Sequence, residues 1–99
     1  MQFTLTIPLK EKRFKITVER IYQSEQIERY EIAGGNKKII LRNNRPQLKN
    51  KKSKKKPEWK LESGTIKDPQ AFALTLLQIE KKIEEIDNPG QVYIHPKNL

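Results

Sequence analysis

The sequence predicts an α+β domain in which a curved antiparallel sheet of about five strands carries one C-terminal amphipathic helix packed on one face. Several segments within residues 2–62 alternate apolar and polar side chains, as half-buried strands do. Polar or glycine-containing turns separate the first four of these segments. Residues 69–87 instead repeat apolar side chains every three or four positions, which is the helical period. A sheet and a helix with one apolar face each bury those faces against one another.

The strands are expected at residues 2–9, 13–22, 27–33, 38–42 and 58–62. The alternation of the second segment changes phase at Ile21, which predicts a β-bulge or a strong bend. Gly34, Gly35 and Asn36 tolerate a positive φ and predict a tight turn before the fourth segment. Because consecutive segments are joined by short turns, the first four strands form an antiparallel meander.

The helix is expected to begin with Asp68 as the N-cap and Pro69 at the first helical position, and to run to about Asp87. Its apolar stripe consists of Phe72, Leu76, Ile79, Ile83 and Ile86. Further apolar residues broaden the stripe in the first half of the helix, beyond what one sheet needs. This excess predicts a homodimer contact through the helix.

We expect a single domain over residues 1–90, with a flexible lysine-rich loop at 49–57 and a tail at 91–99. No apolar run approaches the ~18 residues that cross a bilayer, and the first residues do not resemble a signal peptide. The expected location is therefore the cytoplasm, without a membrane partner. The chain has no cysteine, which excludes disulfides and thiolate metal sites.

The positive charge is concentrated in one part of the chain. The net charge is +9, yet residues 37–60 alone carry eleven basic side chains against Glu58. A run of this kind serves either as an electrostatic arm for phosphates or as a solvated loop that keeps the protein in solution. Lysine lacks the planar fork with which arginine reads bases, so sequence-specific recognition is disfavoured.

The expected phosphate contacts are the basic side chains of this stretch: Lys37, Lys38, Arg42, Arg45, Lys49, Lys51, Lys52, Lys54, Lys55, Lys56 and Lys60. Trp59 follows the run directly and has two interpretations. Its parity with Leu61 favours burial in the core, whereas its position beside lysines would suit stacking on a base. Tyr22 and Tyr30 have the same two interpretations.

Nothing in the sequence favours an enzyme. His95 is the only histidine and lies in the tail, without a nucleophile or carboxylate at a diagnostic spacing. The glycine pair at 34–35 lacks the spacing of a phosphate-binding loop. We therefore expect no catalytic residue, no metal, no cofactor and no small-molecule substrate.

The order of several antiparallel strands followed by one helix resembles the layout of the Pur-type repeat and of the single-strand-binding domain of transcriptional coactivators. No functional residue is carried over, because the resemblance covers the order of elements and no motif. The resemblance implies binding of single strands on a curved sheet and dimerisation through the helix. The expected function is non-specific binding of nucleic acid, DNA or RNA, through residues 37–60; the alternative is a protein-interaction or assembly module without nucleic acid.

Overall fold

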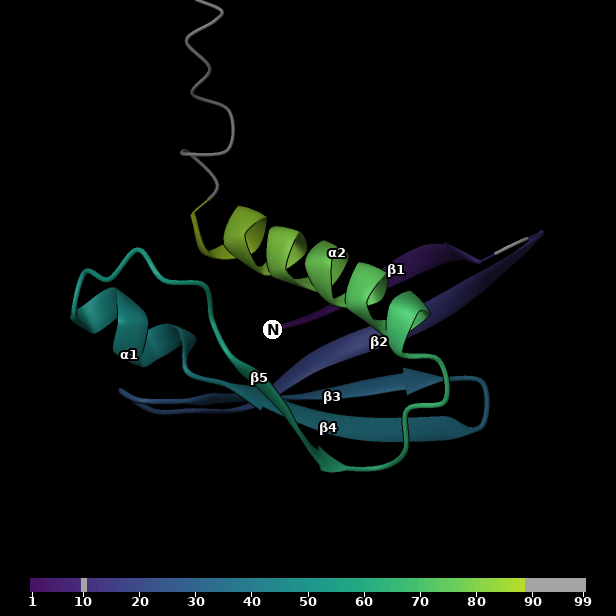
Figure 1. Ribbon diagram of the computed structural model, residues 1–99, viewed down its shortest axis with the longest axis horizontal. Helices are drawn as coiled ribbons and strands as arrows, with labels where there is room; N and C mark the ends of the chain where they lie inside the picture. Colours follow the sequence, from purple (N-terminus) through teal and green to yellow (C-terminus); the bar gives the residue numbers. More distant parts are fainter. Residues whose placement is uncertain (10, 89–99) are drawn as a thin grey trace, which may run out of the picture. The chain divides into compact units, whose positions relative to one another are not determined.

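The computed structural model describes residues 1–9 and 11–88. They form β1 (Gln2–Leu9), β2 (Lys12–Gln23), β3 (Glu28–Gly34), β4 (Lys37–Asn43), α1 (Arg45–Asn50), β5 (Trp59–Ser63) and α2 (Pro69–Asp87). The strands make one sheet in the order β1-β2-β3-β4-β5, and every neighbouring pair is antiparallel (Figure 1). The predicted α+β class, with five strands and a C-terminal helix, is confirmed.

The chain divides into two compact units, Met1–Thr65 and Ile66–Leu99. The first holds the sheet and α1, and the second holds α2. The packing of the helix on the sheet and the single domain over residues 1–90 stay predictions. The tail at 91–99, with His95, lies outside the described residues.

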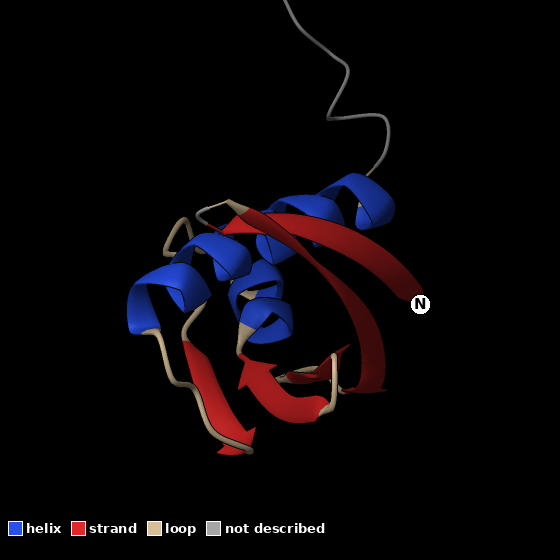
Figure 2. Ribbon diagram, turned by 90° about the vertical axis from the view of Figure 1, so that its right-hand side faces the viewer, coloured by secondary structure: helices blue, strands red, loops and turns tan. Residues whose placement is uncertain are grey.

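The predicted bulge in the second strand is confirmed. Arg20 pairs with Tyr30 and Tyr22 pairs with Arg29, so Ile21 is left without a partner on β3. The extra residue turns Tyr22 to the sheet face opposite to that of Arg20. The sheet also curves strongly, as the red strands of Figure 2 show; the bulge contributes to that curvature because it increases local twist.

The buried side chains of the sheet share one face. Ile7, Val18, Tyr30, Ile32 and Leu41 are buried. Directly opposed residues of antiparallel strands lie on the same face, and the observed register opposes Val18 to Ile32 and Tyr30 to Leu41. The period of two in the sequence therefore gives one apolar face, called the inner face here, and one polar outer face.

Two glycines occupy positions that their lack of a side chain permits. Gly35 has a φ of 60° in the two-residue turn between β3 and β4, which confirms the predicted tight turn. Gly64 follows β5 with a φ of 97°. A Cβ atom on Gly64 would lie 2.5 Å from Cγ2 of Ile39 and 2.8 Å from the backbone oxygen of Lys38. The chain therefore leaves β5 in close contact with β4.

Helix α2 begins as the sequence predicts. The carboxylate of Asp68 accepts hydrogen bonds from the backbone N–H groups of Gln70 and Ala71, at 3.2 and 3.1 Å. Ile79 and Ile83 are its buried residues, one helical turn apart. Within residues 1–9 and 11–88, neither helix combines the length and the apolar character that crossing a bilayer requires.

Helix α1 was not predicted. The predicted loop at 49–57 overlaps its last turn, because the helix runs from Arg45 to Asn50. Lys52 then adopts a positive φ of 53°, and the backbone N–H of Ser53 donates to the carbonyl oxygen of Leu48 at 2.9 Å. The middle of the basic stretch is therefore a short helix with an ordered C-terminal turn. The flexibility of the residues that follow stays a prediction.

We expect Gly64→Ala to lower the free energy of unfolding by about 3 kcal/mol, because backbone strain adds to overpacking against β4. The matched control is Gly35→Ala, where the new Cβ atom would meet no atom within 4 Å. Only backbone strain acts there, so the expected loss is about 1 kcal/mol. Urea unfolding followed by circular dichroism measures both, and equal losses would contradict the packing argument.

Candidate nucleic-acid interface

A buried ion pair fixes the start of α1. Nη1 of Arg45 lies 3.0 Å from Oε1 and 2.8 Å from Oε2 of Glu28, and both residues are buried. Arg45 stands at the first position of α1, and Glu28 begins β3. The burial of the Arg45 side chain corrects the expectation that this residue contacts phosphate. Arg45 instead anchors α1 to the sheet, because a buried charge is strongly destabilising unless it keeps its oppositely charged partner.

Neighbouring polar groups extend this pair along the inner face. Nε of Arg20 lies 3.5 Å from Oε2 of Glu28 and donates to the hydroxyl oxygen of Tyr30 at 3.1 Å. Burial, followed by the nearby Glu28 carboxylate, raises the pKa of the Tyr30 hydroxyl above its ordinary value. The hydroxyl is therefore protonated at neutral pH. Four side chains, Arg20, Glu28, Tyr30 and Arg45, thus form one polar cluster, of which Arg20 alone is half-buried and the other three are buried.

Trp59 lies at the edge of this cluster. Its ring centroid is 5.7 Å from that of Tyr30, with the planes tilted by 45°, and the side chain is half-buried. This favours the packing role over an exposed stacking role for Trp59. The expected partner in the core, Leu61, is 42% exposed. The alternation of residues 58–62 therefore placed Trp59 on the correct face of the sheet but overestimated the burial of Leu61, which lies on an edge strand.

Three further hydrogen bonds hold the segment from Asn44 to Glu58 at both ends. The backbone N–H of Gln47 donates to the carbonyl oxygen of Gln26 at 3.3 Å, and Nδ2 of Asn50 donates to that of Glu25 at 2.9 Å. The backbone N–H of Glu58 donates to Oδ1 of Asn44 at 2.9 Å. The first two bonds dock α1 on the connection between β2 and β3, and the third closes the segment.

The exposed lysines lie around the end of this segment. Lys49 is in the last turn of α1, Lys51 and Lys52 form the turn after it, and three more precede β5. All six are exposed: Lys49, Lys51, Lys52, Lys54, Lys55 and Lys56. Within the described part of the chain, no carboxylate lies at salt-bridge distance from the last five. These six residues are called the lysine segment below.

The outer face carries a second basic feature. Tyr22 on β2 is opposite Arg29 on β3, Arg29 is opposite Arg42 on β4, and Arg42 is opposite Lys60 on β5. The four side chains therefore make one row across four strands, called the outer row below. The guanidinium carbon of Arg29 lies 5.0 Å from the ring centroid of Tyr22. Three cations and one aromatic ring thus follow one another along the outer face.

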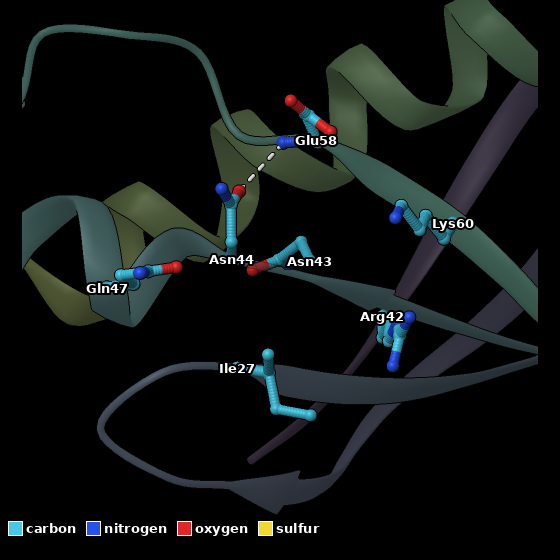
Figure 3. A pocket seen from close by; sticks show the side chains of 7 residues that line it. All are labelled: Ile27, Arg42, Asn43, Asn44, Gln47, Glu58 and Lys60. Carbon is cyan, nitrogen blue, oxygen red and sulfur yellow. Dashed lines mark hydrogen bonds between the residues drawn. The ribbon is translucent and has the colours of Figure 1, made fainter.

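A cavity of about 290 Å³ adjoins the end of the outer row. Figure 3 shows Arg42 and Lys60 on one side of it and Gln47 of α1 on the other. Its lining is Ile27, Arg42, Asn43, Asn44, Gln47, Glu58 and Lys60. Oδ1 of Asn43 accepts a hydrogen bond from the backbone N–H of Arg45 at 2.7 Å, while its buried Nδ2 has no partner among the described residues. The cavity therefore joins the outer row to α1 through a polar lining.

The structure thus brings only part of the expected basic set together. Arg42 and Lys60 share the outer row, and the lysine segment begins in the last turn of α1. Lys37 and Lys38 are exposed at the start of β4, at the other end of that strand, and Arg45 is buried. Arg29 was missed, because it lies outside the basic stretch. The signal for it is the register that places it beside Arg42.

Comparison of the chain with protein-family models, curated proteins and solved structures finds no match. Among residues 1–9 and 11–88, no three histidine, cysteine, aspartate or glutamate side chains are grouped so as to hold a metal ion. The interpretation of the site therefore depends on its own geometry and charge.

We expect Arg45→Met to destabilise the protein by about 3–5 kcal/mol, because it leaves the Glu28 carboxylate buried without its cation. The control is Arg42→Met on the outer row, where the side chain is 41% exposed and the expected loss is at most about 1 kcal/mol. Urea unfolding of both variants tests the anchor. Equal midpoints would show that the buried pair does not hold α1.

Proposed function

We propose that the chain binds nucleic acid non-specifically through the basic stretch 37–60. The observation that carries the proposal is the lysine segment: six exposed ammonium groups, five of which have no carboxylate partner among the described residues. Phosphates of a nucleic-acid backbone supply the closely spaced negative charges that such a segment attracts. Arg42 and Lys60, from the same basic stretch, add two cations on the outer face.

The chemistry of these groups supports contact with the backbone over reading of bases. An ammonium group is a compact point charge without the rigid fork that pairs with a base edge. Arg45, the arginine nearest to the lysine segment in the sequence, is bound to Glu28. The expected preference is therefore for phosphate density, in DNA or RNA, with little dependence on sequence.

Replacing all six residues of the lysine segment by glutamine tests the proposal. Glutamine removes each charge and has nearly the helix propensity of lysine, so α1 is preserved. If about six phosphates are contacted on duplex DNA, the logarithm of the binding constant falls against that of the salt concentration with a slope near −5. The variant should lose most of that slope and bind about 100-fold more weakly at low salt.

The control replaces two lysines of the second unit, Lys81 and Lys82, by glutamine. Binding of the control should change by less than about threefold, because these charges lie outside the basic stretch. Fluorescence anisotropy with labelled duplex DNA and RNA at two salt concentrations measures each constant. A salt-independent constant, or equal affinities of the six-residue variant and the unaltered protein, would refute the proposal.

A second function, assembly through α2, is supported by two exposed leucines. Leu74 and Leu77 are 61% and 56% exposed and stand three residues apart, so they are neighbours on one side of the helix. Two-fold pairing with a second copy of the chain would cover them and needs only one self-complementary surface. The occupant that this proposal names is a homodimer partner.

We expect Leu74→Lys/Leu77→Lys to convert a dimer into a monomer in sedimentation equilibrium, because four ammonium groups would meet at the interface. The control is Gln2→Lys/Thr4→Lys, which adds the same charge at exposed polar positions of β1, outside α2. A monomeric unaltered protein at all concentrations measured would remove this second function.

A further inference from the structure

A carboxylate beside the outer row, that of Glu62, contacts two of the cations of the row. Oε1 of Glu62 lies 2.9 Å from Nε of Arg29, and Oε2 lies 3.6 Å from Nη1 of Arg42. Glu62 comes from β5, whereas the two arginines face each other across β3 and β4. One carboxylate thus spans two adjacent guanidinium groups. This is also the position from which a phosphate group would contact both of them.

A register shift places Glu62 there. Leu61 pairs with Leu41 and Ser63 pairs with Ile40, so Glu62 has no partner residue on β4. Its carboxylate reaches the outer face, where Lys60 of the same strand also lies. The arginines, in contrast, stand on paired positions of the two strands beside it. The cations are therefore held by the sheet ladder, whereas the anion comes from an unpaired position at the sheet edge.

The three side chains remain accessible to solvent. Arg29, Arg42 and Glu62 expose 38, 41 and 26% of their side chains, although Nε of Arg29 is itself buried, so salt and competing anions reach the exposed parts of these groups. Exposed ion pairs contribute little to stability, so replacing the carboxylate by another anion requires little free energy. Lys60 adds a third positive charge beside them, with no carboxylate at salt-bridge distance within the described part of the chain.

We propose that Arg29 and Arg42 form a phosphate subsite for the nucleic-acid backbone, and that Glu62 occupies this subsite in the free protein as an internal competitor that the phosphate displaces. This inference rests on the proposed nucleic-acid function and assigns it a second, separate contact on the sheet. Phosphate binding releases the carboxylate, which gains a counterion from solution. Glu62 therefore lowers the affinity of the free protein without contacting the ligand.

Tyr22 adds a contact that phosphate alone does not use. It is 45% exposed at the end of the outer row, with Arg29 over its ring. A base attached to a phosphate at Arg29 could stack on the remaining ring surface. In this orientation the base of the ligand lies towards β2 and its phosphate lies towards β4. A polyanion without bases would make the phosphate contact alone, so the contact with Tyr22 is specific to a nucleic acid.

The decisive variant is Glu62→Gln, with Glu19→Gln as the matched control. Glu19 is exposed on the outer face of β2, and the described residues place no cation at salt-bridge distance from it. Both variants remove one negative charge from one face. Titration of a labelled oligodeoxythymidine of about 20 nucleotides by fluorescence anisotropy, between about 50 and 200 mM salt, gives the affinity and the salt slope.

We expect Glu62→Gln to bind the oligonucleotide about three- to tenfold more tightly at low salt, the range that release of one or two exposed ion pairs supplies. The salt slope should steepen by about one, because no freed carboxylate takes up a counterion. Glu19→Gln should gain less than about twofold. In an Arg29→Gln/Arg42→Gln background, the gain from Glu62→Gln should disappear, because the two cations for which Glu62 and phosphate compete are gone.

Equal gains from the two glutamate variants, a weaker binding of Glu62→Gln, or a gain that persists without the arginines would overturn the inference. These results leave the proposed function standing if the six-residue lysine variant still loses affinity. Conversely, if the six-residue lysine variant binds as tightly as the unaltered protein while Glu62→Gln still binds more tightly, only the proposed role of the lysine segment is refuted. If the unaltered protein binds no oligonucleotide at about 50 mM salt, both proposals are wrong. Thermal unfolding of each variant controls for folding.

Discussion

The buried contact between Arg45 and Glu28 is the interaction on which the position of the lysine segment depends. A six-residue helix is too short to be stable by itself in water. Here its first residue is bound to the sheet by a buried guanidinium–carboxylate pair, and two hydrogen bonds tie its later residues to the connection between β2 and β3. The lysines follow directly. The first of them, Lys49, therefore has a fixed position on α1.

The two basic features differ in the physical character of their cations. The lysine segment carries flexible ammonium groups at a turn and in the residues before β5, which suits attraction at a distance and adaptation to many backbone paths. The outer row instead places planar guanidinium groups on paired strand positions, about one strand spacing apart. The first feature can draw a polyanion towards the surface, whereas the second offers it a defined geometry.

Much of the architecture was predictable because it depends on local patterns. Alternation marked most of the strands, and a run of three apolar residues marked the fourth. The phase change at Ile21 marked the bulge, and Asp68 with Pro69 marked the start of α2. Helix α1 was not predictable, because its stability comes from Glu28, a residue 17 positions away. For the same reason, composition alone classed Arg45 with the exposed lysines, although the fold buries it.

The outer row shows the same limit at the candidate site. Tyr22, Arg29, Arg42 and Lys60 are scattered over 39 positions of sequence, and only the pairing register aligns them. The turn between β3 and β4 fixes the register of Arg29 with Arg42 and was recognisable from its glycines. The shift that frees Glu62 from pairing has no such signature, because no glycine or change of alternation marks it within β5.

The unpaired residue in β2 has one further consequence, which concerns how this surface tolerates change along evolutionary time. Because Ile21 has no partner on β3, its loss by a single-codon deletion would leave Tyr22 directly after Arg20 and still opposite Arg29, on the same face as before. Deletion of a regularly paired residue would instead turn the adjoining part of the strand to the other face. Position 21 is therefore a place in β2 where the length of the chain can change without changing the chemistry that the sheet presents to its surroundings.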